Sequence, residues 1–276
     1  MRYIKLDVCC DYLGEIPSFI GSMLRGTYGV ALKDVSCVNP KFECQGCFAT
    51  SSCAYYRCYE SKNQKSPIRF EYDLEPKRLD FSLYVFGDMT TQLPYLLSAL
   101  QKMVEQKGFG AERQKGKIRS ISSEDKILYD GKEFASLEDI KPKEFICDKV
   151  SEDVTIKLLT PLRIKEDNRY ARKTIRLQTL LNSIAMIERE LDGVMGRGLG
   201  YEISYGDIKS KLEFVDYTRY SNRQKTKMQF GGLVGQVDVR RLDARSYRLL
   251  KLGEIVGIGK STMFGLGRIK VEDRDG

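Results

Sequence analysis

The sequence predicts an α+β protein built from two tandem ferredoxin-like βαββαβ domains, the first of which carries a cysteine-rich insertion. Two observations predict this class. Strand-like and helix-like patterns recur in the order β-α-β-β-α-β, once in residues 1–145 and again in residues 146–276. The 276 residues are also enough for two ordinary domains, and the 42% apolar content is adequate for two cores.

The first half supplies one complete set of elements. Strands are expected from alternating apolar and polar side chains, and helices from apolar side chains at helical spacing. In chain order the elements are residues 2–9 (strand), 15–35 (helix), 68–74 and 79–87 (strands), 90–108 (helix) and 117–123 (strand). An additional hairpin is expected to turn at Asp130-Gly131.

The second half repeats this order without repeating residue identities. Its longest helix is expected to carry an apolar stripe from Leu177 to Leu191. The expected elements are residues 153–164 (strand), 169–191 (helix), 211–220 and 232–242 (strands), 244–252 (helix) and 267–271 (strand).

Composition narrows the classes of function. No run approaches a membrane span, and the N-terminus lacks the apolar core of a signal peptide, so we expect a cytoplasmic protein with no membrane partner. The chain has no histidine, which removes the commonest acid–base catalyst. Residues 151–276 hold 24 Lys and Arg against 17 Asp and Glu, a net charge of +7, which favours a polyanionic partner.

Four of the eight cysteines have a spacing that indicates a metal site. Cys37, Cys44, Cys47 and Cys53 are spaced C-x6-C-x2-C-x5-C within the insertion, at about residues 37–60. A central C-x2-C is typical of a knuckle around Zn²⁺, and four thiolates complete a tetrahedral site with no open position for catalysis. We therefore expect a structural zinc. Because the outer spacings are irregular, free buried thiols and another kind of metal cluster are the alternatives.

The C-terminal stretch GEIVGIGKSTMFGLGRIKVED places Gly-Lys-Ser behind glycines, yet it does not fit a P-loop. The glycine required five positions before Gly259 is Glu254, and the stretch follows a helix instead of opening one. Glycines let a backbone approach an anion, although the outer ones are also explained by close packing. The candidate contacts to RNA phosphate in this loop are Gly257, Gly259, Lys260, Ser261 and Gly265.

Two further segments combine features that suit RNA. In RYSNRQKTKM, basic side chains that hold phosphates are interleaved with an aromatic side chain that stacks on unpaired bases. Basic residues also crowd the first turns of the 169–191 helix, where the helix dipole disfavours them. A solvated basic surface is the alternative for both. The candidates are Arg219, Tyr220, Arg223, Lys225 and Lys227 in the first segment, and Arg172 and Lys173 in the second.

Five segments occur together in one known family: MLRGTYGVALKDVSCV, CVNPKFECQGCFATSSCAYY, TPLRI, YTRYSNRQKTKMQFGGLVG and GIGKSTMFGLGRI. With them the chain resembles the CRISPR-associated RAMP endoribonucleases, which process CRISPR repeat RNA. The resemblance implies paired ferredoxin-like folds, a glycine-rich loop lying against RNA, and cleavage without metal. Relatives often have histidine two residues before the Gly-Lys of the loop, where this chain has Gly257.

The resemblance also directs attention to the first helix, where relatives place functional groups facing the glycine-rich loop. Metal-independent cleavage uses the RNA 2′-hydroxyl as nucleophile and leaves a 2′,3′-cyclic phosphate. The matching segment offers Arg25, Tyr28 and Lys33 as catalytic candidates. Tyr28 is expected to transfer a proton, with Lys33 or Lys260 as its electrostatic partner; an ordinary core tyrosine is the alternative. Two functions stay open: a repeat-RNA endoribonuclease, or a catalytically inactive subunit that grips repeat or guide RNA beside other Cas effector subunits. A homodimer is also open.

Overall fold

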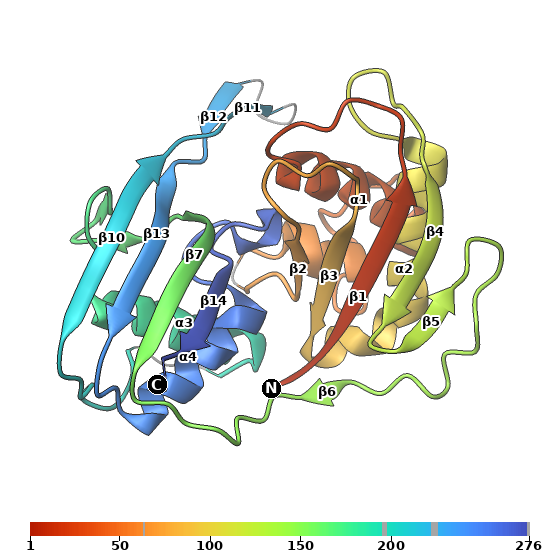
Figure 1. Cartoon of the computed structure of the whole chain (residues 1–276). Helices are drawn as coiled ribbons and strands as arrows, with labels where there is room; N and C mark the ends of the chain where they lie inside the picture. Colours follow the sequence, from red (N-terminus) through yellow and green to blue (C-terminus); the bar gives the residue numbers. More distant parts are fainter. Residues whose placement is uncertain (63, 195–197, 222–225, 275–276) are drawn as a thin grey trace. The chain divides into compact units, whose positions relative to one another are not determined.

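The computed structural model describes residues 1–62, 64–194, 198–221 and 226–274, and it describes only the backbone at 218–221 and 226–229. The chain divides into two compact units, Met1–Glu144 and Phe145–Gly276, one residue from the boundary expected from the sequence. Each unit is built around its own antiparallel sheet (Figure 1). No helix among these residues is long and apolar enough to cross a membrane.

The first unit has a ferredoxin-like sheet. Its strands are ordered β2-β3-β1-β4-β5, all pairs antiparallel, and β6 (Lys143–Glu144) pairs with the start of β1. The main elements are β1 (Arg2–Asp11), α1 (Gly21–Ser36), β2 (Ile68–Glu71), β3 (Phe81–Phe86), α2 (Leu93–Gln101), β4 (Lys117–Ser123) and β5 (Lys126–Tyr129). Short helical segments are η1 (Tyr56–Glu60), η2 (Gly87–Gln92) and η3 (Lys102–Lys107), the last of which continues α2.

The alternation in β1 sends every second side chain into the core, as the period-two pattern predicts. Ile4, Leu6, Val8 and Cys10 are all at most 4% exposed. The turn expected at Asp130-Gly131 is present, since the Asp130 carboxylate accepts from two backbone N–H groups further along the turn and Tyr129 bridges Phe134. The first unit therefore follows the predicted order of elements, although the helix expected over 15–35 begins at Gly21 and the strand expected over 68–74 ends at Glu71.

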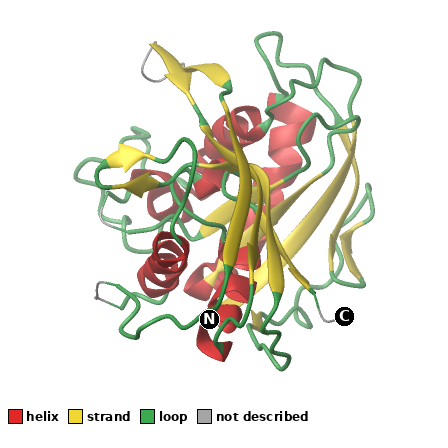
Figure 2. Cartoon of the chain, turned by 60° about the vertical axis from the view of Figure 1, so that its left-hand side comes forward, coloured by secondary structure: helices red, strands yellow, loops and turns green. Residues whose placement is uncertain are grey.

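The second unit has the same topology. Its sheet is ordered β10-β13-β7-β14, and α3 and α4 lie against one face of it (Figure 2). The elements are β7 (Val154–Leu162), α3 (Leu177–Leu191), β10 (Ile208–Val215), β13 (Gly232–Val239), α4 (Ala244–Val256), η4 (Thr262–Phe264) and β14 (Ile269–Asp273). Two small ribbons stand outside this sheet: β8 (Lys165–Glu166) with β9 (Arg169–Tyr170), and β11 (Thr218–Ser221) with β12 (Thr226–Gln229).

In this unit, the predicted start of one helix and the predicted end of one strand are wrong. The helix expected from residue 169 begins at Leu177, because Asp167 and Asn168 have φ of +48° and +63° and turn the chain into the β8–β9 hairpin. Two consecutive left-handed residues are typical of the type I′ turn, which Asp and Asn favour. The strand expected over 211–220 ends at Val215, and its remainder joins the separate ribbon β11–β12.

Candidate nucleic-acid interface

The glycine-rich loop, residues 257–267, joins α4 to β14, and its glycines are tied into the second unit. Gly257 and Gly265 are buried. The backbone N–H groups of Gly257, Gly259 and Gly265 donate to Gly253 O (2.9 Å), Ser183 Oγ (2.8 Å) and Thr262 O (2.9 Å). Because these donors are already used, the expectation that these three glycines offer bare backbone to an RNA phosphate is wrong.

Close packing explains why the loop needs glycine. A Cβ on Gly259 would lie 2.5 Å from the carbonyl oxygen of Arg163, and one on Gly267 would collide with the carbonyl of Ile258. Both residues also have left-handed φ, +80° and +69°, which side chains disfavour. Close packing, which the sequence analysis offered as another explanation for the outer glycines of the loop, therefore also explains Gly259 in its middle.

The tip of the loop presents side chains in place of backbone. Lys260 is exposed, and Ser261 is partly exposed in a left-handed conformation with φ of +65°. The Lys260 N–H donates to Arg163 O (2.7 Å), which ties the tip to the end of β7. The loop can therefore offer an ammonium and a hydroxyl to an anion from a fixed position.

Arg163, which accepts this hydrogen bond from Lys260, is part of a group of cationic side chains that lie against aromatic rings. We call this group the basic–aromatic cluster; its residues are Arg163, Lys165, Tyr170, Arg172, Phe214 and Phe230. The Arg163 guanidinium is 4.4 Å from the Tyr170 ring centre and 5.7 Å from that of Phe230. The Lys165 ammonium is 5.4 Å from the Tyr170 ring, and the Arg172 guanidinium is 4.7 Å from the Phe214 ring. Such stacking fixes the cations at these positions.

The sequence interpretation missed Arg163, Lys165 and Tyr170 as site candidates. Their signal was the segment TPLRIKEDNRY, in which basic and aromatic residues flank an Asp-Asn turn. Since β8 and β9 pair Lys165 with Tyr170, the hairpin brings together residues that are apart in the chain. The sequence analysis assigned this segment to a strand followed by a helix, and in that arrangement these three residues would not lie next to one another.

The basic residues before α3 divide into two groups. The Arg176 guanidinium is bound by Glu166 (3.1 Å) and Asp167 (3.4 Å), whereas Arg172 and Lys173 are exposed. Burial pushes the pKa of Glu166 upward, but hydrogen bonds from the Thr179 hydroxyl and from Arg176 outweigh it and hold the pKa below its ordinary value. All of the basic residues precede the first turn of α3, so the helix-dipole argument for an anionic partner does not apply.

The ribbon β11–β12 carries part of the RYSNRQKTKM candidates. Its backbone register pairs Arg219 with Met228 and Tyr220 with Lys227. Arg223 and Lys225 lie outside the described residues. These five candidates therefore remain a prediction from sequence.

The structure contradicts the role expected for Tyr28. Its side chain is 0% exposed, its ring packs edge-on against Phe70 (5.4 Å between centres), and its hydroxyl donates to Leu96 O (3.2 Å). Burial raises the pKa of this phenol well above its ordinary value, so it stays neutral. Tyr28 is a core residue of the first unit.

Arg25 and Lys33 lie along one stripe of α1 and face the cysteine-rich insertion. The Arg25 guanidinium is 4.9 Å from the Tyr59 ring centre, and the Lys33 ammonium is 5.0 Å from the Tyr55 ring centre. The two rings are stacked on each other, 5.4 Å apart. Between them on α1, a Cβ on Gly29 would meet the Tyr59 ring at 2.7 Å. In this setting the two cations hold the insertion against the helix.

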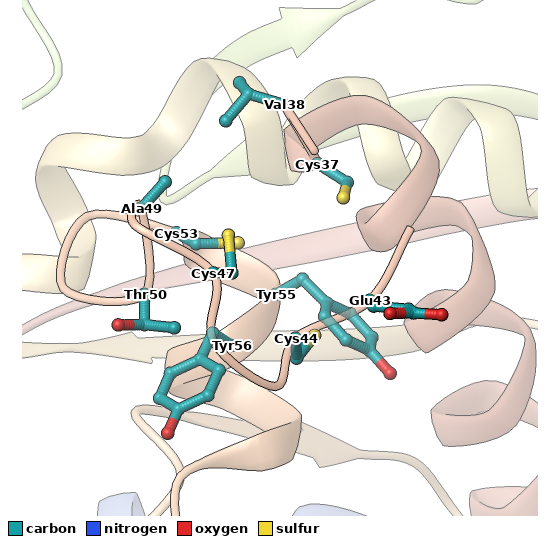
Figure 3. A pocket seen from close by; sticks show the side chains of 10 residues that line it. All are labelled: Cys37, Val38, Glu43, Cys44, Cys47, Ala49, Thr50, Cys53, Tyr55 and Tyr56. Carbon is teal, nitrogen blue, oxygen red and sulfur yellow. The ribbon is translucent and has the colours of Figure 1, made fainter. Parts of the chain in front are cut away.

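The four cysteines of the insertion line one small cavity with Glu43, Tyr55 and Tyr56 (Figure 3). All eight cysteines of the chain are free thiols. Among the described residues, no three or more His, Cys, Asp or Glu side chains are already arranged to hold a metal ion. The four cysteines therefore line one cavity, but their side chains are not arranged as the ligands of a metal ion.

Comparison with known proteins gives a consistent assignment. Residues 1–142 match the family model AF_1859_N, an N-terminal domain, and residues 156–269 match the model of the CRISPR-associated endoribonuclease Cas6. An uncharacterized protein of Archaeoglobus fulgidus is 27% identical over 93% of each chain.

Solved structures share the fold at low sequence identity. A Cas6 product complex has a TM-score of 0.59 at 14% identity, covering 99% of this chain and 100% of that chain. A RAMP protein binding different RNA substrates has a TM-score of 0.53 at 12% identity, covering 98% and 100%. A Cas6-related protein from Pyrococcus furiosus has a TM-score of 0.52 at 11% identity, covering 99% and 100%.

Two tandem ferredoxin-like units are the architecture that this chain shares with the Cas6 and RAMP structures. Because the Cas6 model matches most of the second unit and these neighbours share the fold over nearly the whole chain, the resemblance seen in the sequence is confirmed. The chain belongs to the family of the AF_1859_N domain, whose model covers residues 1–142; its residues 156–269 match the Cas6 endoribonuclease model, and the whole chain has the fold of the Cas6 structures.

Proposed function

We propose that this protein binds CRISPR repeat RNA and cleaves the precursor transcript into guide RNAs, without a metal ion, through attack by the RNA 2′-hydroxyl. The observation that carries the proposal is the basic–aromatic cluster beside the Lys260–Ser261 tip. The match of residues 156–269 to the Cas6 endoribonuclease model supports the reaction, and the cluster supports the place at which RNA binds.

The cluster suits RNA because it combines two kinds of contact. Guanidinium and ammonium groups bind phosphate oxygens, while Tyr170 and Phe214 are rings on which unpaired bases can stack. Arg163 connects the cluster to the glycine-rich loop, because its side chain lies against Tyr170 and its carbonyl accepts the hydrogen bond from the Lys260 N–H. A bound strand would therefore meet the cations of the cluster and Lys260 of the loop tip together.

In-line attack of a 2′-hydroxyl needs a positioned strand, a cation near the developing phosphorane charge, and two proton transfers. Lys260 is the natural candidate for the charge because it is exposed at a tip fixed by a 2.7 Å hydrogen bond. With Tyr28 buried and no histidine in the chain, lysine, exposed tyrosine such as Tyr170, and water are left as proton carriers. We expect a slow enzyme, because lysine is a weak proton carrier at neutral pH.

The test is incubation of the full chain with its own repeat RNA in excess EDTA. A discrete product ending in a 2′,3′-cyclic phosphate, with a 5′-hydroxyl on the other fragment, supports the proposal. Arg163→Ala and Arg172→Ala should weaken RNA binding, whereas Arg248→Ala on α4, whose guanidinium pairs with Glu188, serves as a charge-matched control.

A second candidate function follows from the missing histidine: a subunit that binds repeat or guide RNA without cutting it, in company with other Cas proteins. Tight binding with no cyclic-phosphate product over long incubation would favour this function. The same Arg163 and Arg172 variants would then still lose affinity.

A further inference from the structure

The cysteine-rich insertion is held in place without a core of its own. None of residues 37–53 is buried, and the segment contains no helix or strand. Its large apolar side chains point outward, with Val38, Phe42 and Phe48 being 64%, 48% and 85% exposed. A segment of this kind buries little apolar surface to offset the loss of chain entropy, and a disulfide or a metal is the usual further source of order in such segments.

The four cysteines of this segment come from three places in the chain. Cys37 caps the C-terminal end of α1, Cys53 directly precedes the helical turn into η1, and Cys44 and Cys47 come from the loop between them. All four line the same cavity, as Figure 3 shows. They are free thiols, so disulfides do not provide the order.

The local backbone around the central pair fits a metal knuckle. The Cys47 N–H donates to Cys44 O (3.3 Å), which closes a turn over Gln45 and Gly46. Gly46 has φ of +70°, and a Cβ there would meet nothing within 4 Å, so backbone conformation rather than packing requires the glycine. A turn of this kind brings the two ends of a C-x2-C pair close together, as a metal knuckle requires.

We propose that Cys37, Cys44, Cys47 and Cys53 bind one Zn²⁺ ion as four thiolates. The ion fastens the insertion between the end of α1 and the start of η1. Four thiols lose their protons on binding and leave a site of net charge −2. Lys33, whose ammonium lies over the Tyr55 ring that lines the cavity, supplies a compensating positive charge.

Binding requires the four sulfur atoms to turn toward a common centre. Of these four thiols, Cys37 contacts Asn39 O (3.7 Å) and Cys53 contacts Ser36 O (4.0 Å), and both contacts are weak. Rotation about one cysteine side-chain bond passes between staggered positions of similar energy, so the reorganisation is small. Cys58, buried at 4% exposure in η1, is not among the cavity-lining residues and is left out of the site.

The experiment is elemental analysis of the full chain purified without added metal and without chelator. We expect about one zinc per chain, the stoichiometry of a single four-thiolate site. Replacing the metal with Co²⁺ should give the intense visible absorption of tetrahedral cobalt thiolate. Cys44→Ser and Cys47→Ser should reduce bound zinc at least roughly tenfold, whereas Cys9→Ser and Cys147→Ser, outside the insertion, should leave it unchanged.

A protein with less than about one tenth of a zinc per chain, no cobalt thiolate absorption and four reactive native thiols in the insertion would overturn the proposal. Iron with iron–sulfur absorption in place of zinc would also overturn it. The wild-type measurements decide the matter even if a serine variant fails to fold. RNA cleavage is not a readout, so this result stands apart from the proposed function.

Discussion

At the scale of single residues, the site is defined by which side chains reach solvent. Lys260 and Arg172 are exposed in the second unit, and Tyr28 is enclosed in the first. From residue type alone, Lys260, Arg172 and Tyr28 were all candidates for contact with RNA. Burial separates them, because a fully enclosed phenol can neither touch RNA nor exchange a proton with it.

Lys260→Ala should weaken repeat-RNA binding, or the stabilisation of the transition state, by about 1–3 kcal/mol, the scale of a charge-assisted contact. Filter binding measures the RNA affinity, and single-turnover cleavage measures the stabilisation of the transition state. Lys251→Ala, on α4 and paired with Glu254 at 2.5 Å, is the matched control and should change neither. Equal effects from both lysines would remove the loop tip from the interface.

Tyr28→Phe keeps the ring and deletes the hydroxyl bonded to Leu96 O. We expect a stability loss of about 1 kcal/mol by urea unfolding, the usual value for one hydrogen bond. The cleavage rate should stay within about twofold of wild type, since a proton-transferring group would contribute roughly 100-fold or more. A loss of that larger size would restore Tyr28 to the catalytic site.

At the scale of elements, α4 carries the glycine-rich loop and depends on its N-cap. The Asp243 carboxylate accepts from the Ser246 N–H (2.9 Å), the Ser246 hydroxyl (2.7 Å) and the Ser204 N–H (3.1 Å). Burial pushes the pKa of Asp243 upward, but these hydrogen bonds outweigh burial and hold the pKa below its ordinary value. The charged form is therefore the stabilising one.

The sign of the pH dependence follows. A pKa that is lower in the folded protein stabilises it above the unfolded value of about 4, and this stability is lost as pH falls through the folded pKa. Asp243→Ala should cost about 1 kcal/mol at pH 7, as for other N-caps, and less at pH values below the folded pKa. Urea unfolding at several pH values measures this, with Asp192→Asn at the exposed end of α3 as control.

At the scale of the whole molecule, charge is divided unevenly: the second half carries +7 of the total +8. RNA affinity that depends on this half should fall steeply with salt, because binding releases counterions. Replacing Arg219, Arg223, Lys225 and Lys227 together by alanine should flatten the slope of log K against log salt. The expected change is about 0.7 for each RNA phosphate that the variant no longer neutralises.

The matched control removes the same charge from the first unit, through alanine at the exposed residues Lys115, Lys117, Lys126 and Lys132. The slope should then change little. If both variants flatten the slope equally, the response reports net charge alone, and the ribbon β11–β12 has no specific part in the interface.

The sequence by itself determined the fold. Period-two alternation in β1 and the apolar stripe of α3 define which face of each element is buried, and their order gives two βαββαβ units. These are local patterns, so they can be recognised without knowing what packs where. The family resemblance follows from motifs of the same local kind.

Only the tertiary structure decided the site. Gly259 of the loop proves to be packed because it meets Ser183, 76 positions earlier in the sequence, and the still earlier Arg163. Tyr28 is enclosed by Phe70 and α2, and the β8–β9 hairpin brings Arg163 and Lys165 against Tyr170. Exposure and hydrogen-bond partners are set by contacts between distant segments, and residue type does not encode those contacts.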